Sequence, residues 1–72
     1  MRRRGMIQRN PTRRERQIFN GLARGWKNGR IAEEIGISES TVKVYASRMF
    51  KKFGVTSRLE AALFWQRNFI YE

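Results

Sequence analysis

Apolar residues recur every three or four positions in four segments of the chain, which is the periodicity of amphipathic α-helices. The first predicted helix begins at Thr12, because Thr12 and Glu15 have the spacing of a capping box, and it ends at Gly25. A second helix is predicted over residues 28–35. The apolar stripe of the first helix consists of Ile18, Phe19, Leu22 and Ala23. With two further helices toward the C-terminus, the pattern predicts an all-α domain.

The segment Asn28–Ser47 has the residue pattern of a helix-turn-helix motif. Ala32 is a small residue at which a second helix can cross closely, and Gly36 stands where the first helix of the motif must stop. Glycine suits that stop because the residue after a helix commonly adopts the left-handed conformation. Ser38 can cap the following helix, and Val42 then anchors that helix inward. An ordinary helical hairpin is the alternative interpretation.

The third predicted helix runs from Ser38 to Phe53, and its outward face carries the candidate chemistry. Residues at spacings of three and four form one stripe there, without an acid or a bulky side chain: Ser40, Lys43, Val44, Ser47 and Lys51. Such a stripe fits a DNA major groove about 12 Å wide, where Lys43 can reach guanine acceptors and Val44 a thymine methyl group. Ser40 and Ser47 complete the candidate base-reading set.

Polar side chains next to this stripe can donate hydrogen bonds to phosphate oxygens. The candidate contacts to the DNA backbone are Thr41, Tyr45, Arg48, Lys51, Asn28 and Lys27. For Tyr45, a half-buried packing role is the alternative.

The fourth predicted helix begins with a second capping box, formed by Ser57 and Glu60. The residues expected to pack on the domain are Leu59, Ala62, Leu63 and Ile70. The apolar residues left outside that stripe are Ala61, Phe64, Trp65 and Phe69. Because a small domain cannot bury a helix that is apolar nearly all round, this surface predicts an interaction site. The expected homodimer interface is Ala61, Phe64, Trp65 and Asn68; the alternative is that the terminal turns fold back over the first helix.

The amino-acid composition limits the classes of function that this chain can have. Sixteen Lys and Arg against six acidic residues give a net charge of +10, which favours a polyanionic partner over a merely solvated basic surface. Without cysteine or histidine, neither a disulfide framework nor zinc binding nor histidine-based catalysis is expected, and no cofactor is predicted. An enzyme is the least favoured class, because no polar cluster supplies a nucleophile with a base.

The N-terminal residues 1–10 combine a charge cluster, a glycine and little apolar content, which predicts a flexible basic tail. The alternative is an arm that touches DNA. No apolar run approaches the roughly 20 residues that span a bilayer, and no apolar core follows the N-terminal charges as in a signal peptide. We therefore expect no membrane partner and a cytoplasmic, nucleoid-associated protein.

Three stretches, PTRRERQIFNGLARG, N-x-x-IAEEIGISESTVKVY and MFKKFGVTSRLEAA, resemble the LuxR/FixJ-type (GerE-like) DNA-binding domain. The resemblance covers residues 11–67 and is close to the output domains of NarL-like response regulators. We expect the protein to be bacterial or phage-encoded. The resemblance implies four helices, with the third in the major groove and the fourth forming a symmetric dimer. It also implies that Lys43 and Val44 face bases and that Thr41 contacts the backbone. Residues 11–72 are accordingly expected to form the domain.

Some residues depart from the family pattern. Ser47 stands where NarL-like members can carry a basic base-reading residue, and Tyr45 stands where many members have histidine. The prediction is a sequence-specific, dimeric regulator of transcription that binds double-stranded DNA, with RNA polymerase as a further candidate partner. The alternative is an interaction protein that captures a LuxR-type regulator in an inactive heterodimer through the fourth helix. A stand-alone regulator and the end of a longer one both fit this sequence.

Overall fold

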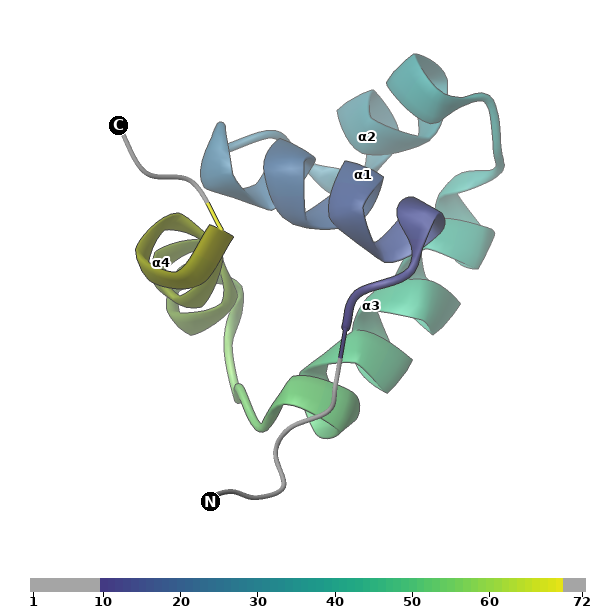
Figure 1. Ribbon diagram of the computed structural model, residues 1–72. Coiled ribbons are helices and arrows are strands. Elements are labelled where there is room, and N and C mark those ends of the chain that lie inside the picture. The colour runs from purple at the N-terminus through teal and green to yellow at the C-terminus, as the bar shows by residue number, and fades with distance from the viewer. Residues whose placement is uncertain (1–9, 70–72) are drawn as a thin grey trace.

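The computed structural model describes residues 10–69, which form four helices and, within that range, no strand (Figure 1). The helices are α1 (Arg13–Ala23), α2 (Asn28–Ile35), α3 (Glu39–Phe53) and α4 (Arg58–Phe69). Helix α1 packs against the other three, and α2 also packs against α3. The predicted all-α class is therefore confirmed. Most of the expected N-terminal tail, and Ile70 on the fourth helix, lie outside the described residues.

Local capping signals place the start of α1 as predicted. Thr12 is the N-cap, and its hydroxyl accepts from the Glu15 N–H at 3.2 Å while the Glu15 carboxylate accepts from the Thr12 N–H at 2.8 Å. This carboxylate is buried, and it also accepts from the Lys52 ammonium at 3.0 Å. Lys52 donates in addition to the Asn10 carbonyl at 3.3 Å. The ammonium therefore ties the last turn of α3 to the start of α1.

The turn between α2 and α3 also follows the predicted pattern. Gly36 ends α2 with a φ of 77°, the left-handed conformation that favours glycine. Ser38 caps α3, and its hydroxyl accepts from the Thr41 N–H at 3.1 Å. The end of α2 and the start of α3 are thereby set by residues within a few positions of the turn.

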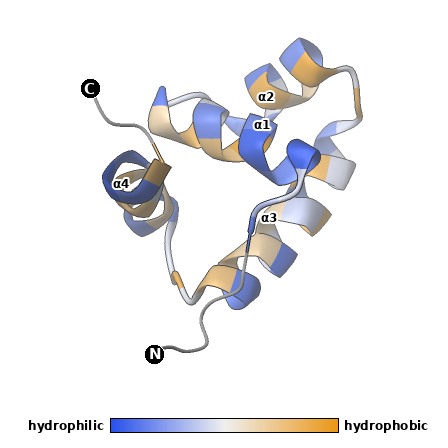
Figure 2. Cartoon of the chain, viewed as in Figure 1, coloured by the Kyte–Doolittle hydropathy of each residue, from blue (hydrophilic) through white to orange (hydrophobic). Residues whose placement is uncertain are grey.

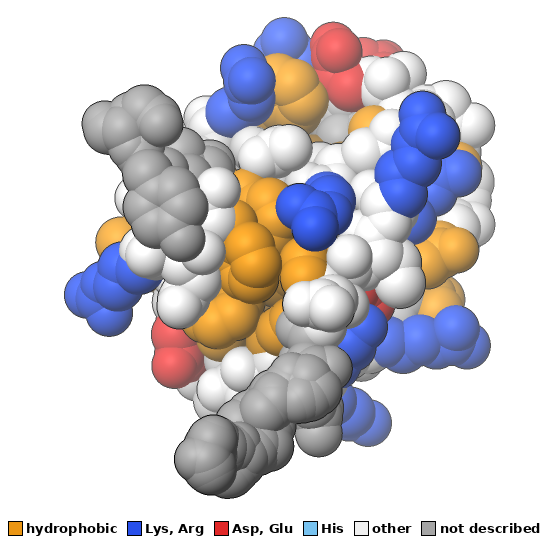
Figure 3. Space-filling view, viewed as in Figure 1, with side chains coloured by type: hydrophobic (Ala, Val, Ile, Leu, Met, Phe, Trp, Pro, Cys, Tyr) orange, Lys and Arg blue, Asp and Glu red, His pale blue; other side chains and the backbone are white. Residues whose placement is uncertain are grey.

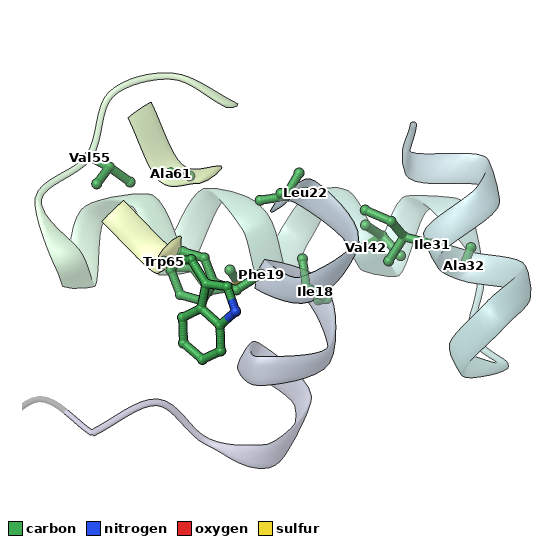
Figure 4. Close-up of a cluster of buried hydrophobic side chains, with 10 residues drawn as sticks. Ile18, Phe19, Leu22, Ile31, Ala32, Val42, Val55, Ala61 and Trp65 are labelled. Atoms are coloured by element: carbon green, nitrogen blue, oxygen red, sulfur yellow. The ribbon is translucent and has the colours of Figure 1, made fainter. Parts of the chain in front are cut away.

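The core lies where α1 crosses the other helices (Figure 4). Its fully buried large side chains come from three helices: Ile18, Phe19, Ile31, Val42 and Met49. Gly21 permits the close approach of α1 and α2, because a Cβ at this position would lie 2.6 Å from Cγ1 of Ile31. A larger residue at position 21 requires the Ile31 side chain or the two helices to shift.

The predicted orientation of the fourth helix was wrong. Ala61 is 0% exposed and Trp65 is 3% exposed, although both were expected to face outward. Leu59 and Leu63, which were expected to face inward, are 70% and 40% exposed. The face of α4 that packs on the domain is therefore nearly the opposite of the predicted one.

Aromatic packing against α1 explains this orientation. The Trp65 ring lies parallel to the Phe19 ring with centroids 4.9 Å apart, and the two stacked rings overlap in the view of Figure 4. The indole N–H donates to the side-chain oxygen of Asn20 at 2.7 Å. A tryptophan is best buried where both its ring and its N–H find partners, and α1 supplies both. A leucine at position 65 has no side-chain donor and could not form the hydrogen bond to the Asn20 oxygen.

The remaining expectations for α4 are met in part. Phe64 is half-buried and contacts the rings of Phe19 and Phe53, whereas Asn68 is exposed and donates to the Phe64 carbonyl at 2.8 Å. At the helix start, the Ser57 hydroxyl accepts from the Glu60 N–H at 3.0 Å, which is one half of the predicted capping box.

The Glu60 carboxylate departs from the other half of that box. It accepts from the N–H and the hydroxyl of Thr56, both at 2.7 Å, rather than from Ser57. These two hydrogen bonds lower the pKa of the Glu60 carboxyl below its usual 4.5. The bond from the Thr56 hydroxyl is the larger cause of this lowered pKa and the bond from the Thr56 backbone N–H is the second. The start of α4 is therefore stabilised by an ionised carboxylate.

Candidate nucleic-acid interface

The outward face of α3 presents the predicted base-reading residues to solvent. Ser40, Lys43, Val44 and Ser47 are all exposed. Val44 stands out because half of this aliphatic side chain remains accessible in a domain that buries its other valines, Val42 and Val55. Hydrophilic and hydrophobic residues alternate along α3, as Figure 2 shows. The structure thus places these four side chains on one open helical face, which is the geometry that contact with base edges requires.

The predicted backbone contacts on α3 fall into two groups. Arg48 and Lys51 are exposed on α3 and have cationic donors available for phosphate oxygens. Thr41 is half-buried, and its hydroxyl lies 2.8 Å from that of Ser38. Tyr45 is also half-buried and packs against the core. For Tyr45 the packing role is therefore present, with part of the side chain still accessible.

The start of α2 carries the two other predicted backbone contacts. Lys27 is exposed and is the N-cap residue, but its side chain does not cap the helix. Asn28 is half-buried, and its side-chain oxygen accepts from the Arg58 guanidinium at 2.6 Å. A second nitrogen of Arg58 donates to the Trp26 carbonyl at 2.7 Å. Arg58 therefore joins the first residue of α4 to the start of α2.

Further cations surround Trp26 at the same end of α2. The Arg30 guanidinium lies 4.5 Å from the centroid of the indole ring, and that of Arg24 lies 5.4 Å away. Both are within the distance at which a cation is attracted to an aromatic face. Arg30 also pairs with Glu34 at 3.2 Å, but both side chains are exposed, so this pair adds little stability. These contacts hold positive charge next to Lys27.

Sequence reasoning did not identify Arg58 and Trp26 as part of this site. Their contacts join residues 30 and 32 positions apart, which helical periodicity cannot report. The available signal was the presence of Arg58 in the motif that resembles the family. The face in Figure 3 shows Lys and Arg side chains projecting around an apolar area between α1, α3 and α4.

The predicted interface residues on α4 are not brought together on one accessible surface. Ala61 and Trp65 belong to the core, Phe64 is half-buried, and Asn68 is exposed. The apolar side chains that α4 does expose are Leu59 and Leu63, four residues apart and hence neighbours on the helix surface. Among the described residues of α4, these leucines are therefore its most exposed large apolar side chains.

Within residues 10–69, no helix is long and apolar enough to cross a membrane. Across that same range, no three or more acidic, histidine or cysteine side chains gather in a group that could hold a metal ion. The features that are present are a tight turn at Gly36, an open polar stripe on α3 and cations at the start of α2. Together they define a helix-turn-helix domain of the DNA-binding class.

Comparison with known proteins identifies the family. Residues 11–65 match the family described as bacterial regulatory proteins, luxR family, and the chain belongs to it. The predicted resemblance is therefore confirmed. The members of this family are DNA-binding regulators of transcription.

Individual relatives agree with this membership. The nitrate/nitrite response regulator protein NarL of Escherichia coli strain K12 is 43% identical over 60 residues, which cover 83% of this chain and 28% of the relative. The probable transcriptional regulatory protein SgaR of Hyphomicrobium methylovorum is 44% identical over 50 residues, or 69% of this chain and 24% of the relative. The chain thus spans only about a quarter of the length of these relatives.

Proposed function

We propose that this domain reads a specific DNA sequence and thereby regulates transcription, with α3 in the major groove. The observation that carries the proposal is the open stripe of Ser40, Lys43, Val44 and Ser47, which contains no acidic side chain. A carboxylate in this stripe would be repelled by the phosphates on either side of the groove. Family membership supports DNA as the partner. In this proposal the protein acts in the bacterial cytoplasm, at the nucleoid. RNA polymerase is a candidate further partner of the protein.

The individual roles follow from side-chain chemistry. Lys43 donates to the O6 and N7 acceptors of guanine, and Val44 contacts a thymine methyl group. Arg48 and Lys51 donate to phosphates and set the position of α3 without reading sequence. Thr41 has its hydroxyl proton available for a phosphate when Ser38 is the donor in their mutual hydrogen bond. Ser40 and Ser47 donate to or accept from either base of a pair.

Selection of bound duplexes from a random pool tests this function, followed by titration of variants on the selected site. Lys43→Ala should weaken binding to that site by about 1–3 kcal/mol and relax the preference at one position per half-site. Arg48→Ala is the matched control on the same helix, and it should weaken binding to all sequences alike. An unchanged sequence preference in Lys43→Ala would contradict base reading by α3.

We further propose a homodimer that pairs through α4, as the family resemblance implies, but centred on Leu59 and Leu63. These side chains are exposed, and Leu59 borders a hollow of about 250 Å³ whose lining includes Leu22 and Ala62 as well as the cations Lys27 and Arg58. Burying such apolar surface against a second copy removes it from water. A two-fold axis would make the operator an inverted repeat with half-site centres about 10 bp apart.

The pairing is tested by Leu59→Glu and Leu63→Glu, with Arg67→Glu as a control at an exposed residue of the same helix. Each leucine variant should keep its helical circular dichroism but sediment as a monomer and bind the two half-sites without cooperativity. Cooperative binding by both leucine variants would contradict pairing through this face. A heterodimer formed through α4 by an antagonist would have no need of the α3 stripe, so we prefer the DNA-binding regulator.

A further inference from the structure

We propose that Arg58 is a positioning residue for DNA binding, which orients the side-chain amide of Asn28 toward the DNA backbone. This inference rests on the proposed function, because it concerns how the same interface holds phosphate. The observation behind it is the fork of two short hydrogen bonds, 2.6 Å to the Asn28 side-chain oxygen and 2.7 Å to the Trp26 carbonyl. Both atoms lie where the loop after α1 enters α2.

The chemistry of arginine decides which way the Asn28 amide points. A guanidinium has donors only, so the atom of Asn28 that it contacts must be the oxygen. The amide nitrogen, with its two donors, then points away from Arg58. Among the residues that the structure describes, that nitrogen donates no hydrogen bond. Because Asn28 is half-buried, an amide held in this orientation presents its N–H groups to a ligand from one side.

The charge around Asn28 indicates that this ligand is a phosphate oxygen. Lys27, the preceding residue, is exposed, and the guanidinium groups of Arg24 and Arg30 lie against the neighbouring Trp26 ring. An amide N–H among such cations is a typical donor to the DNA backbone. Arg58 uses its fork on two protein oxygens, so it acts on DNA through Asn28.

The bridge has a second consequence, because Arg58 is the first residue of α4. Arg58 thereby links α4, the helix that we propose for pairing, to the start of α2, where Asn28 contacts the DNA backbone in our proposal. A shift of α4 relative to α2 must break one of two short hydrogen bonds or move Asn28. Arg58 therefore couples the start of α4 to the side chain of Asn28.

A double-mutant cycle tests the inference on the complete chain with the selected duplex. Arg58→Ala and Asn28→Ala should each reduce affinity about tenfold on all sequences, and the double variant should lose no more than either single variant. If Arg58 instead contacts phosphate independently, the losses multiply to about a hundredfold, which would overturn the inference. Arg67→Ala removes the same charge from an exposed site on α4 and should change affinity by less than about twofold.

A second variant separates positioning from folding. Asn28→Asp keeps an oxygen for Arg58 but removes the amide donors, so its melting temperature should equal or exceed that of the unmodified chain. Its DNA affinity should nevertheless fall at least as far as that of Asn28→Ala. Binding equal to that of the unmodified chain would overturn the inference. If the unmodified chain binds no duplex at all, the proposed function itself fails, and the two failures are thereby distinguished.

Discussion

The orientation of α4 makes a strong prediction about Trp65. Replacing Trp65 by alanine removes a side chain that is 3% exposed, that stacks on Phe19 at 4.9 Å and on Phe69 at 4.5 Å, and that donates to Asn20 at 2.7 Å. Truncating a buried tryptophan to alanine typically costs about 3–5 kcal/mol of stability. The loss of stability lies at the upper end of this range where the surrounding side chains cannot collapse into the emptied space, as between the two rings that stack on Trp65.

That loss is comparable to the whole stability of the domain. A single core in a chain of this length rarely supplies more than about 3–5 kcal/mol. Trp65→Ala should therefore be largely unfolded at 25 °C, and Trp65→Glu, which adds a buried charge, should be entirely unfolded. Trp65→Phe keeps the ring contacts and loses the indole N–H, so it should retain part of the stability.

Urea denaturation followed by far-ultraviolet circular dichroism measures this effect. Leu59→Ala is the matched control on the same helix, because its side chain is 70% exposed and its removal should change stability by about 0.5 kcal/mol or less. The unfolding should be recorded at low protein concentration, so that dimerisation does not contribute. A change below about 1 kcal/mol in Trp65→Ala, or a larger one in Leu59→Ala, would refute the orientation of α4 derived above.

Four further outcomes are expected. In urea denaturation, Gly21→Ala should destabilise the domain by about 1–3 kcal/mol, because its Cβ would lie 2.6 Å from Ile31. The opposite sign is expected for Gly29→Ala, by about 0.5–1 kcal/mol, because the nearest atom to that Cβ is a flexible carboxylate oxygen at 3.6 Å. Filter binding from low to physiological salt should give a slope of log K against log salt of roughly −5 to −9 for a dimer with about three to five phosphate contacts per monomer; a flat dependence would contradict phosphate neutralisation. Because the pKa of Glu60 is lowered by the Thr56 bonds, its contribution to stability should be complete above pH 4.5, the usual value, and should be lost as the pH falls below it. Melting curves of Thr56→Val, which removes the hydroxyl donor, should show a smaller loss over that range than the unmodified chain.

The elements of this fold were predictable where the signal is local. The Thr12 capping box, the left-handed Gly36 and the Ser38 cap each depend on hydrogen bonds or backbone angles within about four residues. The open stripe on α3 was predictable for a similar reason. Its members are set by helical spacing alone, once the inward face is identified from Val42 and Met49.

The inward face of α4 could not be read from the same periodicity, since apolar residues surround this helix and two opposite faces are almost equally hydrophobic. The choice depended on two partners on α1: Phe19, whose ring stacks on Trp65, and Asn20, whose oxygen satisfies the indole N–H. The pairing of Lys52 with Glu15 and of Arg58 with Asn28 likewise joins residues 37 and 30 positions apart. The sequence by itself determined where the helices begin and end and which face of α3 stays open, because local bonds decide both. Only the tertiary structure decided which side of α4 is buried and how Asn28 is oriented, because those outcomes depend on partners that the folded chain brings into contact.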